Sequence, residues 1–217
     1  MKTIFIETRR KFKDAEINLS ILKTLPGKTI SLAATIQYIG LVPKVKSYLE
    51  SLGKKVIIKQ GAHYKGHILG CNSTALDKTS DTLLIITDGK FHAINNAIQL
   101  QKEIFVFNTK ALDKVTQTEI DTHNTKTLTK QKKFLSAKFV GLLVSTKHGQ
   151  HNDQIHKIKK KIQALNKKAY IFESNNINTA EFENFPQIQI WVNTACFGLA
   201  RDDMQIINLQ DITQFLK

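Results

Sequence analysis

Residues 81–108 read DTLLIITDGKFHAINNAIQLQKEIFVFN, and this stretch carries the strongest fold signal in the chain. Two runs of mostly apolar residues, at 81–89 and 103–108, flank a segment at 91–101 whose apolar residues recur at helical spacing. Continuous apolar strands joined by a helix are typical of a parallel sheet that is covered on both faces. The stretch therefore predicts a strand–helix–strand unit of an α/β fold.

The same alternation of strands and helices extends toward both ends of the chain. The elements expected upstream are a strand at 3–7, a β-rich segment at 29–37, a helix at 41–53 and a strand at 54–59. The elements expected downstream are a strand and loop at 139–150, a helix at 151–168, and strands at 169–173 and 188–196. Together they predict an α/β protein throughout.

The two halves of the chain resemble one another. The sequence TIQ at 35–37 pairs with TKHGQ at 146–150, and each follows a strand and precedes a helix. This alignment predicts two similar small domains, each a short, mostly parallel sheet flanked by helices, related by internal duplication. We place the domains at residues 1–125 and 126–217. Segment 109–138, rich in Lys, Thr and Gln without clear periodicity, is expected to connect them.

The chain is strongly basic, with 32 Lys and Arg against 18 Asp and Glu among 217 residues, a net charge of +14. Such an excess is the electrostatic footprint of nucleic-acid binding, or it reflects a Lys-rich composition without function. The basic residues are spread along the chain, so a nucleic-acid partner stays open and is not favoured. No apolar run is long enough for a membrane span or a signal peptide, so we expect a cytoplasmic protein with no membrane partner.

The two cysteines lie at comparable points of the two halves. Cys71 follows a glycine in a turn, and Cys196 ends a predicted strand, where α/β domains bind ligands. Each thiol is either a small buried hydrophobe, which is common for a free cysteine, or a metal ligand. Nearby histidines, His63 and His67 in one half and His148 and His151 in the other, match no standard zinc spacing. No phosphate-binding, dinucleotide-binding or hydrolase motif occurs.

Polar residues follow the predicted strands and are candidates for ligand contacts. The amide of Gln150 or Gln37 is able both to donate and to accept hydrogen bonds, so it contacts a ligand or caps the following helix. The candidate ligand-binding residues are Gln150, Lys147, Gln37, Thr35, Asp88 and His92. For Asp88 the alternative is an ordinary Asp-Gly turn, and for His92 a structural histidine.

The order of the motifs resembles the diphthamide-synthesis family, the 2-(3-amino-3-carboxypropyl)histidine synthases. The resemblance rests on TIQYIGL at 35–41, LGC at 69–71, TDGKFH at 87–92, STKHGQ at 145–150 and TAC at 194–196. It implies three similar α/β domains, each giving one cysteine to a single [4Fe–4S] cluster. The cluster cleaves S-adenosylmethionine, and the 3-amino-3-carboxypropyl group is transferred to a histidine of elongation factor 2. Cys71 and Cys196 match the ligands of the second and third domains, and the six polar candidates named above are the expected contacts of S-adenosylmethionine.

The chain also departs from the family pattern. The segment before residue 35 is too short for the family's first domain, so we expect a second chain, or a homodimer, to complete the site. The family's Cys-Pro-Arg reads Cys-Phe-Gly at 196–198, which removes a planar cation suited to a carboxylate. Two alternatives stay open: a non-catalytic or electron-relay partner subunit, and a basic RNA- or ribosome-associated protein that reuses the fold.

Overall fold

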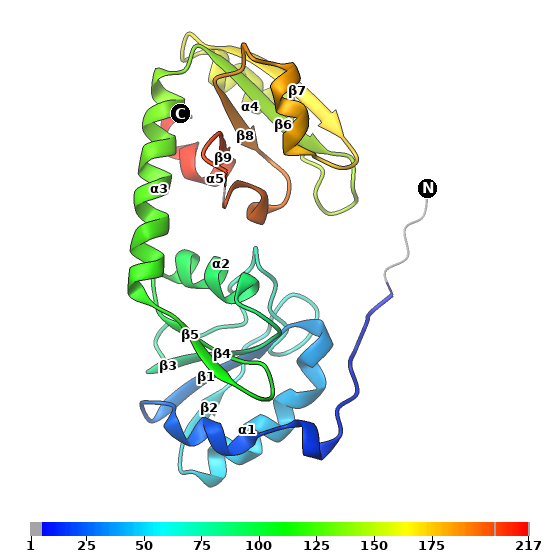
Figure 1. Cartoon of the computed structure of the whole chain (residues 1–217), viewed down its shortest axis with the longest axis vertical. Coiled ribbons are helices and arrows are strands. Elements are labelled where there is room, and N and C mark those ends of the chain that lie inside the picture. Colours follow the sequence, from blue (N-terminus) through cyan, green and yellow to red (C-terminus); the bar gives the residue numbers. More distant parts are fainter. Residues whose placement is uncertain (1–5, 202, 217) are drawn as a thin grey trace. The chain divides into compact units, whose positions relative to one another are not determined.

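The structure, a computed structural model, describes residues 6–201 and 203–216 of the chain (Figure 1). The chain folds into two compact units, Met1–Thr122 and His123–Lys217. The boundary between them falls inside the longest helix, α3 (Gln117–Ser136). Each unit contains one sheet and its own hydrophobic core.

The first unit is built on a five-stranded sheet with the order β2-β1-β3-β4-β5. The first four strands in this order are parallel, and β5 pairs with β4 in the antiparallel direction. The strands are β1 (Thr29–Ala34), β2 (Lys55–Ile57), β3 (Thr82–Ile86), β4 (Ile104–Phe107) and β5 (Leu112–Val115). The helices that follow β1 and β3 are α1 (Val42–Ser51) and α2 (Phe91–Leu100).

Alternate residues of β3 enter two different cores, one on each face of the first sheet. Leu84 and Ile86 pack in the cluster that includes Val45 of α1, whereas Leu83 and Ile85 pack with residues of α2. All five residues of β3 are buried, because helices cover both faces. This confirms the interpretation of the apolar run at 81–89 as a central parallel strand.

The second unit contains a four-stranded parallel sheet with the order β7-β6-β8-β9. Its strands and helices are β6 (Phe139–Ser145), α4 (Ile155–Gln163), β7 (Lys168–Ser174), β8 (Ile190–Asn193), β9 (Ile206–Asn208) and α5 (Leu209–Ile212). The α/β class with two mostly parallel sheets is therefore confirmed. Both sheets place their second strand beside the first and their third on its other side; duplication itself stays a prediction.

Six short 3-10 helices complete the described part of the chain. They are η1 (Asp14–Glu16), η2 (Leu19–Thr24), η3 (Ile36–Leu41), η4 (Thr179–Asn184), η5 (Phe197–Ala200) and η6 (Thr213–Phe215). Two of them directly follow candidate residues, because η3 begins after Thr35 and η5 begins after Cys196.

The boundary between the two units lies inside segment 109–138, the expected connector, but the segment has regular structure that the sequence analysis did not predict: β5 and the 20-residue helix α3. The helix is mostly polar, and Ile120, Lys130 and Phe134 are its buried residues. So few inward-facing positions give a weak periodic signal. The sequence nevertheless carries a start signal for this helix. Glu119 accepts a hydrogen bond from the backbone N–H of Thr116 at 2.8 Å, and its own N–H donates to the Thr116 hydroxyl at 3.3 Å, which forms a capping box.

Three smaller differences concern element bounds. The expected helix at 151–168 is shorter, because α4 begins at Ile155. Of the expected strand at 3–7, residues 3–5 lie outside the described residues, and Ile6 and Glu7 belong to no regular element. The short strand β9 has no counterpart in the sequence expectation.

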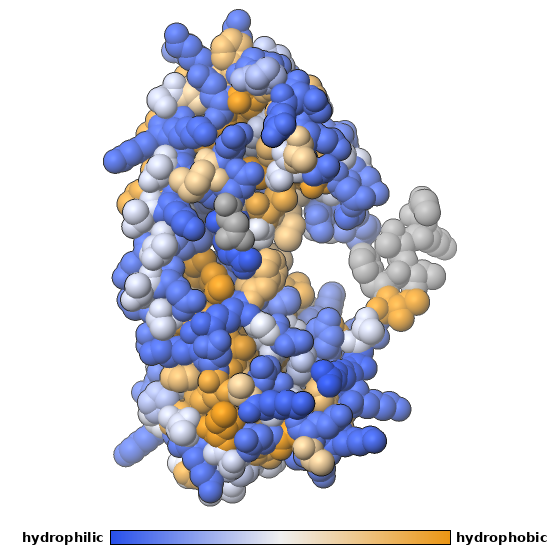
Figure 2. All heavy atoms as spheres, viewed as in Figure 1, coloured by the Kyte–Doolittle hydropathy of each residue, from blue (hydrophilic) through white to orange (hydrophobic). Residues whose placement is uncertain are grey.

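Hydrophilic side chains cover most of the face seen in Figure 2, with apolar residues in scattered patches. Among the described residues, no helix combines the length and the apolar character that a membrane span requires.

Candidate functional site

The carboxyl edge of the first sheet contains a cavity of about 370 Å³. Since β1 and β3 are adjacent parallel strands, the residues that follow them meet at this edge. The residues that line the cavity are Thr8, Arg9, Arg10, Thr35, Gln37, Tyr38, Thr87, Asp88 and His92. Four of the six residues predicted to bind a ligand, Thr35, Gln37, Asp88 and His92, therefore share one cavity.

Two threonine hydroxyls lie at the strand ends that border the cavity. Thr35 follows β1 and Thr87 follows β3, and the two side chains are 3% and 2% exposed. Their hydroxyl oxygens are 3.4 Å apart. The backbone N–H of Thr35 donates to the carbonyl of Ile86 at 3.1 Å, which continues the sheet pairing past the last residue of β1. These contacts fix the position from which the loops with Gln37 and Asp88 depart.

Tyr38 is a buried hydroxyl donor in the cavity wall. Burial raises the pKa of its phenol, Asp88 raises this pKa further, and Arg10 acts in the opposite direction. The hydroxyl is therefore protonated at neutral pH. Tyr38 thus adds a neutral hydrogen-bond donor to a cavity that is also lined by an acidic and a basic side chain.

The imidazole of His92 is neutral at pH 7. Burial lowers its pKa, and the neighbouring His67 lowers this pKa further. Burial likewise lowers the pKa of His67, which is 4% exposed, and His63 adds to the effect. A neutral imidazole is able to accept a proton or to donate one hydrogen bond, so His92 offers both functions at the cavity.

Cys71 lies in a turn of the long connection between β2 and β3. Residues of this connection pair with the end of β1: the Ala34 N–H donates to Gly66 O at 2.8 Å, and the Ile68 N–H donates to Ala34 O at 2.9 Å. From α2, the side-chain amides of Asn96 and Gln99 donate to Leu69 O at 2.9 Å and Gly70 O at 3.1 Å, respectively. Hydrogen bonds from the end of β1 and from α2 thus hold the backbone that leads to Cys71.

Cys196 lies three residues beyond β8, at the start of η5. The side-chain amide of Asn193 donates to the carbonyl of Cys196 at 2.8 Å and to Asn208 at 2.7 Å. The Asn193 oxygen accepts the Ala195 N–H at 3.0 Å. A buried asparagine therefore fixes the turn that carries the second thiol.

Both cysteines are free and exposed, so the interpretation of each as a buried hydrophobe is wrong. Within residues 6–201 and 203–216, no three side chains of His, Cys, Asp or Glu form a group that could hold a metal ion. A [4Fe–4S] cluster with one open iron needs three protein ligands. Exposed thiolates on hydrogen-bonded turns are the kind of ligand that such a cluster uses. The chain supplies two of them, one fewer than the three that are needed.

The remaining two candidates, Lys147 and Gln150, occupy the turn after β6. The Lys147 N–H donates to the Ser145 hydroxyl at 3.2 Å, and the Gln150 N–H donates to Lys147 O at 3.0 Å. Neither residue lines the cavity of the first unit. The N-cap residues of α1 and α4 are Leu41 and Gln154, so neither Gln37 nor Gln150 caps these helices.

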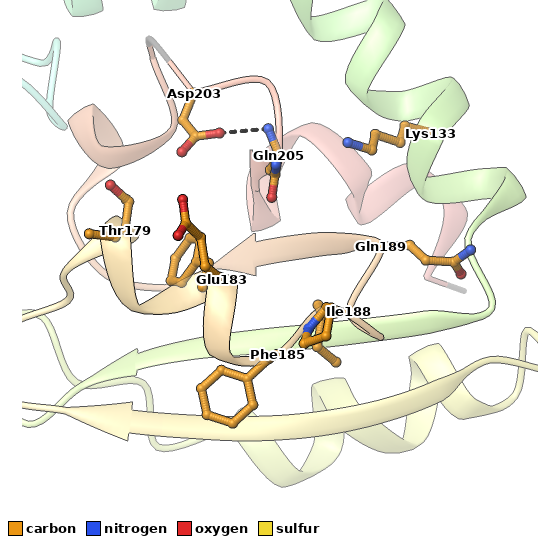
Figure 3. A pocket seen from close by; sticks show the side chains of 11 residues that line it. Lys133, Thr179, Glu183, Phe185, Ile188, Gln189, Asp203 and Gln205 are labelled. Atoms are coloured by element: carbon orange, nitrogen blue, oxygen red, sulfur yellow. Dashed lines mark hydrogen bonds between the residues drawn. The ribbon is translucent and has the colours of Figure 1, made fainter.

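The second unit has a larger surface cavity, of about 730 Å³, that contains none of the predicted residues. Figure 3 shows Lys133 of α3 and Glu183 of η4 at its rim, with Asp203 accepting a hydrogen bond from the Gln205 N–H at 2.7 Å. Its lining contains no cysteine or histidine. We therefore place the candidate site at the cavity of the first unit, despite its smaller volume.

Sequence reasoning missed five residues of the candidate site. Thr8, Arg9 and Arg10 reach the cavity from the N-terminal segment, and Tyr38 and Thr87 lie next to residues that were predicted. Tyr38 directly follows the candidate Gln37, and Thr87 directly precedes the candidate Asp88. A search that includes the immediate neighbours of each candidate at a strand end would have found both. For Arg9 and Arg10 the sequence shows only two adjacent basic residues. It does not predict that they line the cavity, because that depends on contacts between distant segments.

The fold and the candidate site define an α/β protein with a polar cavity at the carboxyl edge of a parallel sheet and one exposed thiol in each unit. Residues 1–206 match the family model described as "Putative diphthamide synthesis protein". The chain belongs to this diphthamide-synthesis family, which confirms the resemblance seen in the sequence.

Individual relatives agree with this assignment. The chain is 28% identical over 210 residues to the 2-(3-amino-3-carboxypropyl)histidine synthase of Pyrococcus horikoshii, covering 93% of this chain and 60% of the relative. It is 32% identical over 162 residues to the enzyme of the same name from Methanocaldococcus jannaschii, covering 69% and 42%. It is 42% identical over 100 residues to subunit 1 of the Aspergillus fumigatus synthase, covering 42% and 21%.

Solved structures show the same fold. The crystal structure of Dph2 from Pyrococcus horikoshii matches with a TM-score of 0.80 at 25% identity, covering 92% of this chain and 60% of that one. The crystal structure of the same protein with a 4Fe-4S cluster matches with a TM-score of 0.78 at 26% identity, with the same coverage. The chain thus spans about 60% of the length of the Pyrococcus protein that it matches.

Proposed function

We propose that this chain takes part in the iron–sulfur-dependent transfer of a 3-amino-3-carboxypropyl group from S-adenosylmethionine to a histidine of elongation factor 2. The observation that carries the proposal is the cavity of the first unit, where Thr35, Gln37, Asp88 and His92 meet. The names of the relatives support it, since they are aminocarboxypropyl histidine synthases.

The side chains of the cavity suit the methionyl end of S-adenosylmethionine. The Gln37 amide is able to donate to a carboxylate and accept from an ammonium group. Asp88 supplies an acceptor for the ammonium group, and Tyr38 supplies a neutral donor. His92, kept neutral by burial, is available to take up the proton that the acceptor imidazole loses when the new carbon–carbon bond replaces its C–H bond; the electron released with that proton would return to the cluster. Lys147 and Gln150, which follow β6 in the second unit, stay proposed contacts of S-adenosylmethionine.

Cys71 and Cys196 are the proposed ligands of a [4Fe–4S] cluster. The support is that both thiols are exposed and lie on anchored turns, and that a structural relative contains such a cluster. When bound, the cluster supplies the electron that breaks a carbon–sulfur bond of the sulfonium. The third ligand that such a cluster needs lies outside residues 1–217, and a partner chain or a second copy of this chain is the proposed source.

A second candidate function is a partner subunit that does not itself catalyse the transfer. The described part of the chain has one thiol in each unit and no three-ligand group, and several relatives are named as subunit 1 of a synthase. A partner subunit of this kind would supply cluster ligands and would not need a complete substrate site of its own.

The proposal is tested by an anaerobic transfer assay with S-adenosylmethionine labelled in its carboxyl carbon and elongation factor 2 as acceptor. We expect label in the acceptor when the chain is mixed with a partner that supplies the third ligand, and little or none with either component alone. An acceptor in which the target histidine is changed to alanine serves as the control. Transfer that needs the partner but survives Asp88→Ala and Gln37→Ala would favour the non-catalytic role.

A further inference from the structure

The N-terminal segment, residues 6–13, runs along the first unit and forms one wall of the cavity. The Arg10 N–H donates to Gln37 O at 3.0 Å, and the Tyr64 hydroxyl donates to Glu7 at 2.6 Å. The ring of Phe12 lies 5.2 Å from the ring of Tyr38. Polar and aromatic contacts thus fix this segment beside the candidate site.

The two arginines of the segment differ in what they contact. Arg9 donates to the Glu7 carboxylate at 2.9 and 3.2 Å and lies 4.7 Å from the centre of the Tyr64 ring. Its charge is therefore already paired. The guanidinium of Arg10 lies 4.8 Å from the centre of the Phe12 ring, and no carboxylate of the described residues pairs with it. Arg10 is the available cation of the cavity wall.

Opposite charges thus line the same cavity, with Arg10 on the N-terminal segment and Asp88 in the loop after β3. Asp88 raises the pKa of the Tyr38 phenol, and Arg10 lowers it. An α-amino-acid end carries a carboxylate and an ammonium group on neighbouring atoms, so it needs a cation and an anion together. A guanidinium also matches the fork of a carboxylate with two parallel hydrogen bonds, which an ammonium group of lysine does not.

We propose that Arg10 binds the carboxylate of the α-amino-acid end of the ligand, while Asp88 binds its ammonium group. This inference rests on the proposed function and adds a specificity-determining residue to its site. It makes the N-terminal segment part of the substrate site, and it predicts that ligands without the carboxylate bind less tightly.

The test compares the binding of S-adenosylmethionine and decarboxylated S-adenosylmethionine to the full chain by anaerobic titration calorimetry. The two compounds share the adenosyl group, the sulfonium and the amine. We expect the unaltered chain to prefer the carboxylated compound by roughly 10- to 100-fold, the effect of a hydrogen-bonded charge pair. In Arg10→Met the two affinities become equal, and Arg10→Lys retains part of the preference.

Lys11→Met is the matched control, since it removes the same charge from the same segment at an exposed residue that does not line the cavity. It should keep the preference of the unaltered chain. If Arg10→Met keeps the full preference for the carboxylated compound and an unchanged melting temperature, the role of Arg10 is overturned while the proposed ligand stands. Failure of the unaltered chain to bind either compound would overturn both this role and the proposed ligand.

Discussion

Gln37 exemplifies the site residues that lie at strand ends. It is exposed, it lies in η3 directly after β1, and its backbone carbonyl already accepts the Arg10 N–H. Its side chain therefore contributes little to the core and is available to a ligand in the cavity. A substitution of Gln37 is therefore expected to change ligand binding without changing the stability of the fold.

We expect Gln37→Ala to weaken the binding of S-adenosylmethionine by about 1–2 kcal/mol, the loss of one hydrogen bond to a charged group. The melting temperature should hardly change. Calorimetric titration and thermal melting check the two parts. Gln150→Ala should weaken binding to a similar degree through the loop after β6. A large fall in melting temperature with unchanged affinity would show that these amides serve the fold instead.

Asp81 gives a pH-dependent prediction. Its carboxylate accepts the N–H groups of Lys28 and Thr29, both at 2.8 Å, and these bonds lower its pKa. Because the folded pKa is the lower one, the stabilisation is complete above the unfolded value of about 3.9. It is lost as the pH falls through the folded value. Asp81→Ala should therefore destabilise the chain near neutral pH and reduce the acid sensitivity of its stability.

Urea unfolding at neutral and acidic pH measures this effect. Asp77→Ala is the matched control, because Asp77 bonds only to Thr79, two residues away, through its carboxylate, and its pKa is lowered by these local bonds. The Asp81 carboxylate instead accepts hydrogen bonds from residues that lie 53 and 52 positions earlier in the chain. Equal destabilisation by the two changes would contradict the importance of the long-range bonds.

The sequence predicted those site residues that depend only on the order of strands. Thr35 and Asp88 follow buried strands that proved to be parallel neighbours, so a general rule placed them together. Arg10 could not be predicted in this way. Its place depends on a segment without regular structure that packs through contacts such as Phe12 with Tyr38. No periodicity in the sequence records such packing.

At the scale of elements, hydrophobic periodicity succeeded where helices and strands face a large core. It failed for α3, because few of the helix's positions face inward. The capping box at Thr116 and Glu119 would have corrected this error, since it depends on local hydrogen bonds rather than on burial. β9 was missed because it is only three residues long, too short to show the alternation of apolar and polar residues that predicts a strand.

Gly141 tests the packing of the second sheet. A Cβ at this position in β6 would lie 2.3 Å from Cε3 of Trp191, a residue of β8 that is 1% exposed. We expect Gly141→Ala to destabilise the chain by about 1–3 kcal/mol, since the ring has to shift in a packed core. Trp191 is the only tryptophan, so its fluorescence reports the unfolding of this unit.

Gly40→Ala is the control for this prediction. Gly40 lies in η3, and a Cβ there would meet nothing within 4 Å. Circular dichroism follows the unfolding of both units, and by this measurement the change should leave stability equal or raise it by about 0.4–1 kcal/mol, because alanine restricts the unfolded chain. A Gly141→Ala chain as stable as the Gly40→Ala chain would show that the Trp191 contact is not tight.

At the scale of the whole molecule, the net charge of +14 has a partly structural explanation. Several lysines donate hydrogen bonds to backbone carbonyls, some at helix ends and others in loops or in β5. These lysines are Lys54, Lys90, Lys102, Lys130, Lys161 and Lys167. Such residues contribute charge without forming a site for nucleic acid.

We therefore expect weak RNA binding at about 0.15 M salt, in the non-specific range of roughly 10⁻⁴ to 10⁻⁶ M. Titration of a labelled structured RNA and a labelled unstructured RNA at several salt concentrations measures both affinity and selectivity. Submicromolar, structure-selective binding at that salt would support the RNA- or ribosome-associated alternative instead.

The most direct test of the account is the iron and sulfide content of the anaerobically purified chain and of its Cys71→Ala and Cys196→Ala variants. Both thiols are exposed, so the variants should keep the fold and the melting temperature. We predict labile, substoichiometric iron in the unaltered chain, more iron once a partner supplies the third ligand, and none in either variant. Iron that persists in both variants, or no iron with any partner, would contradict the assignment of Cys71 and Cys196 as cluster ligands.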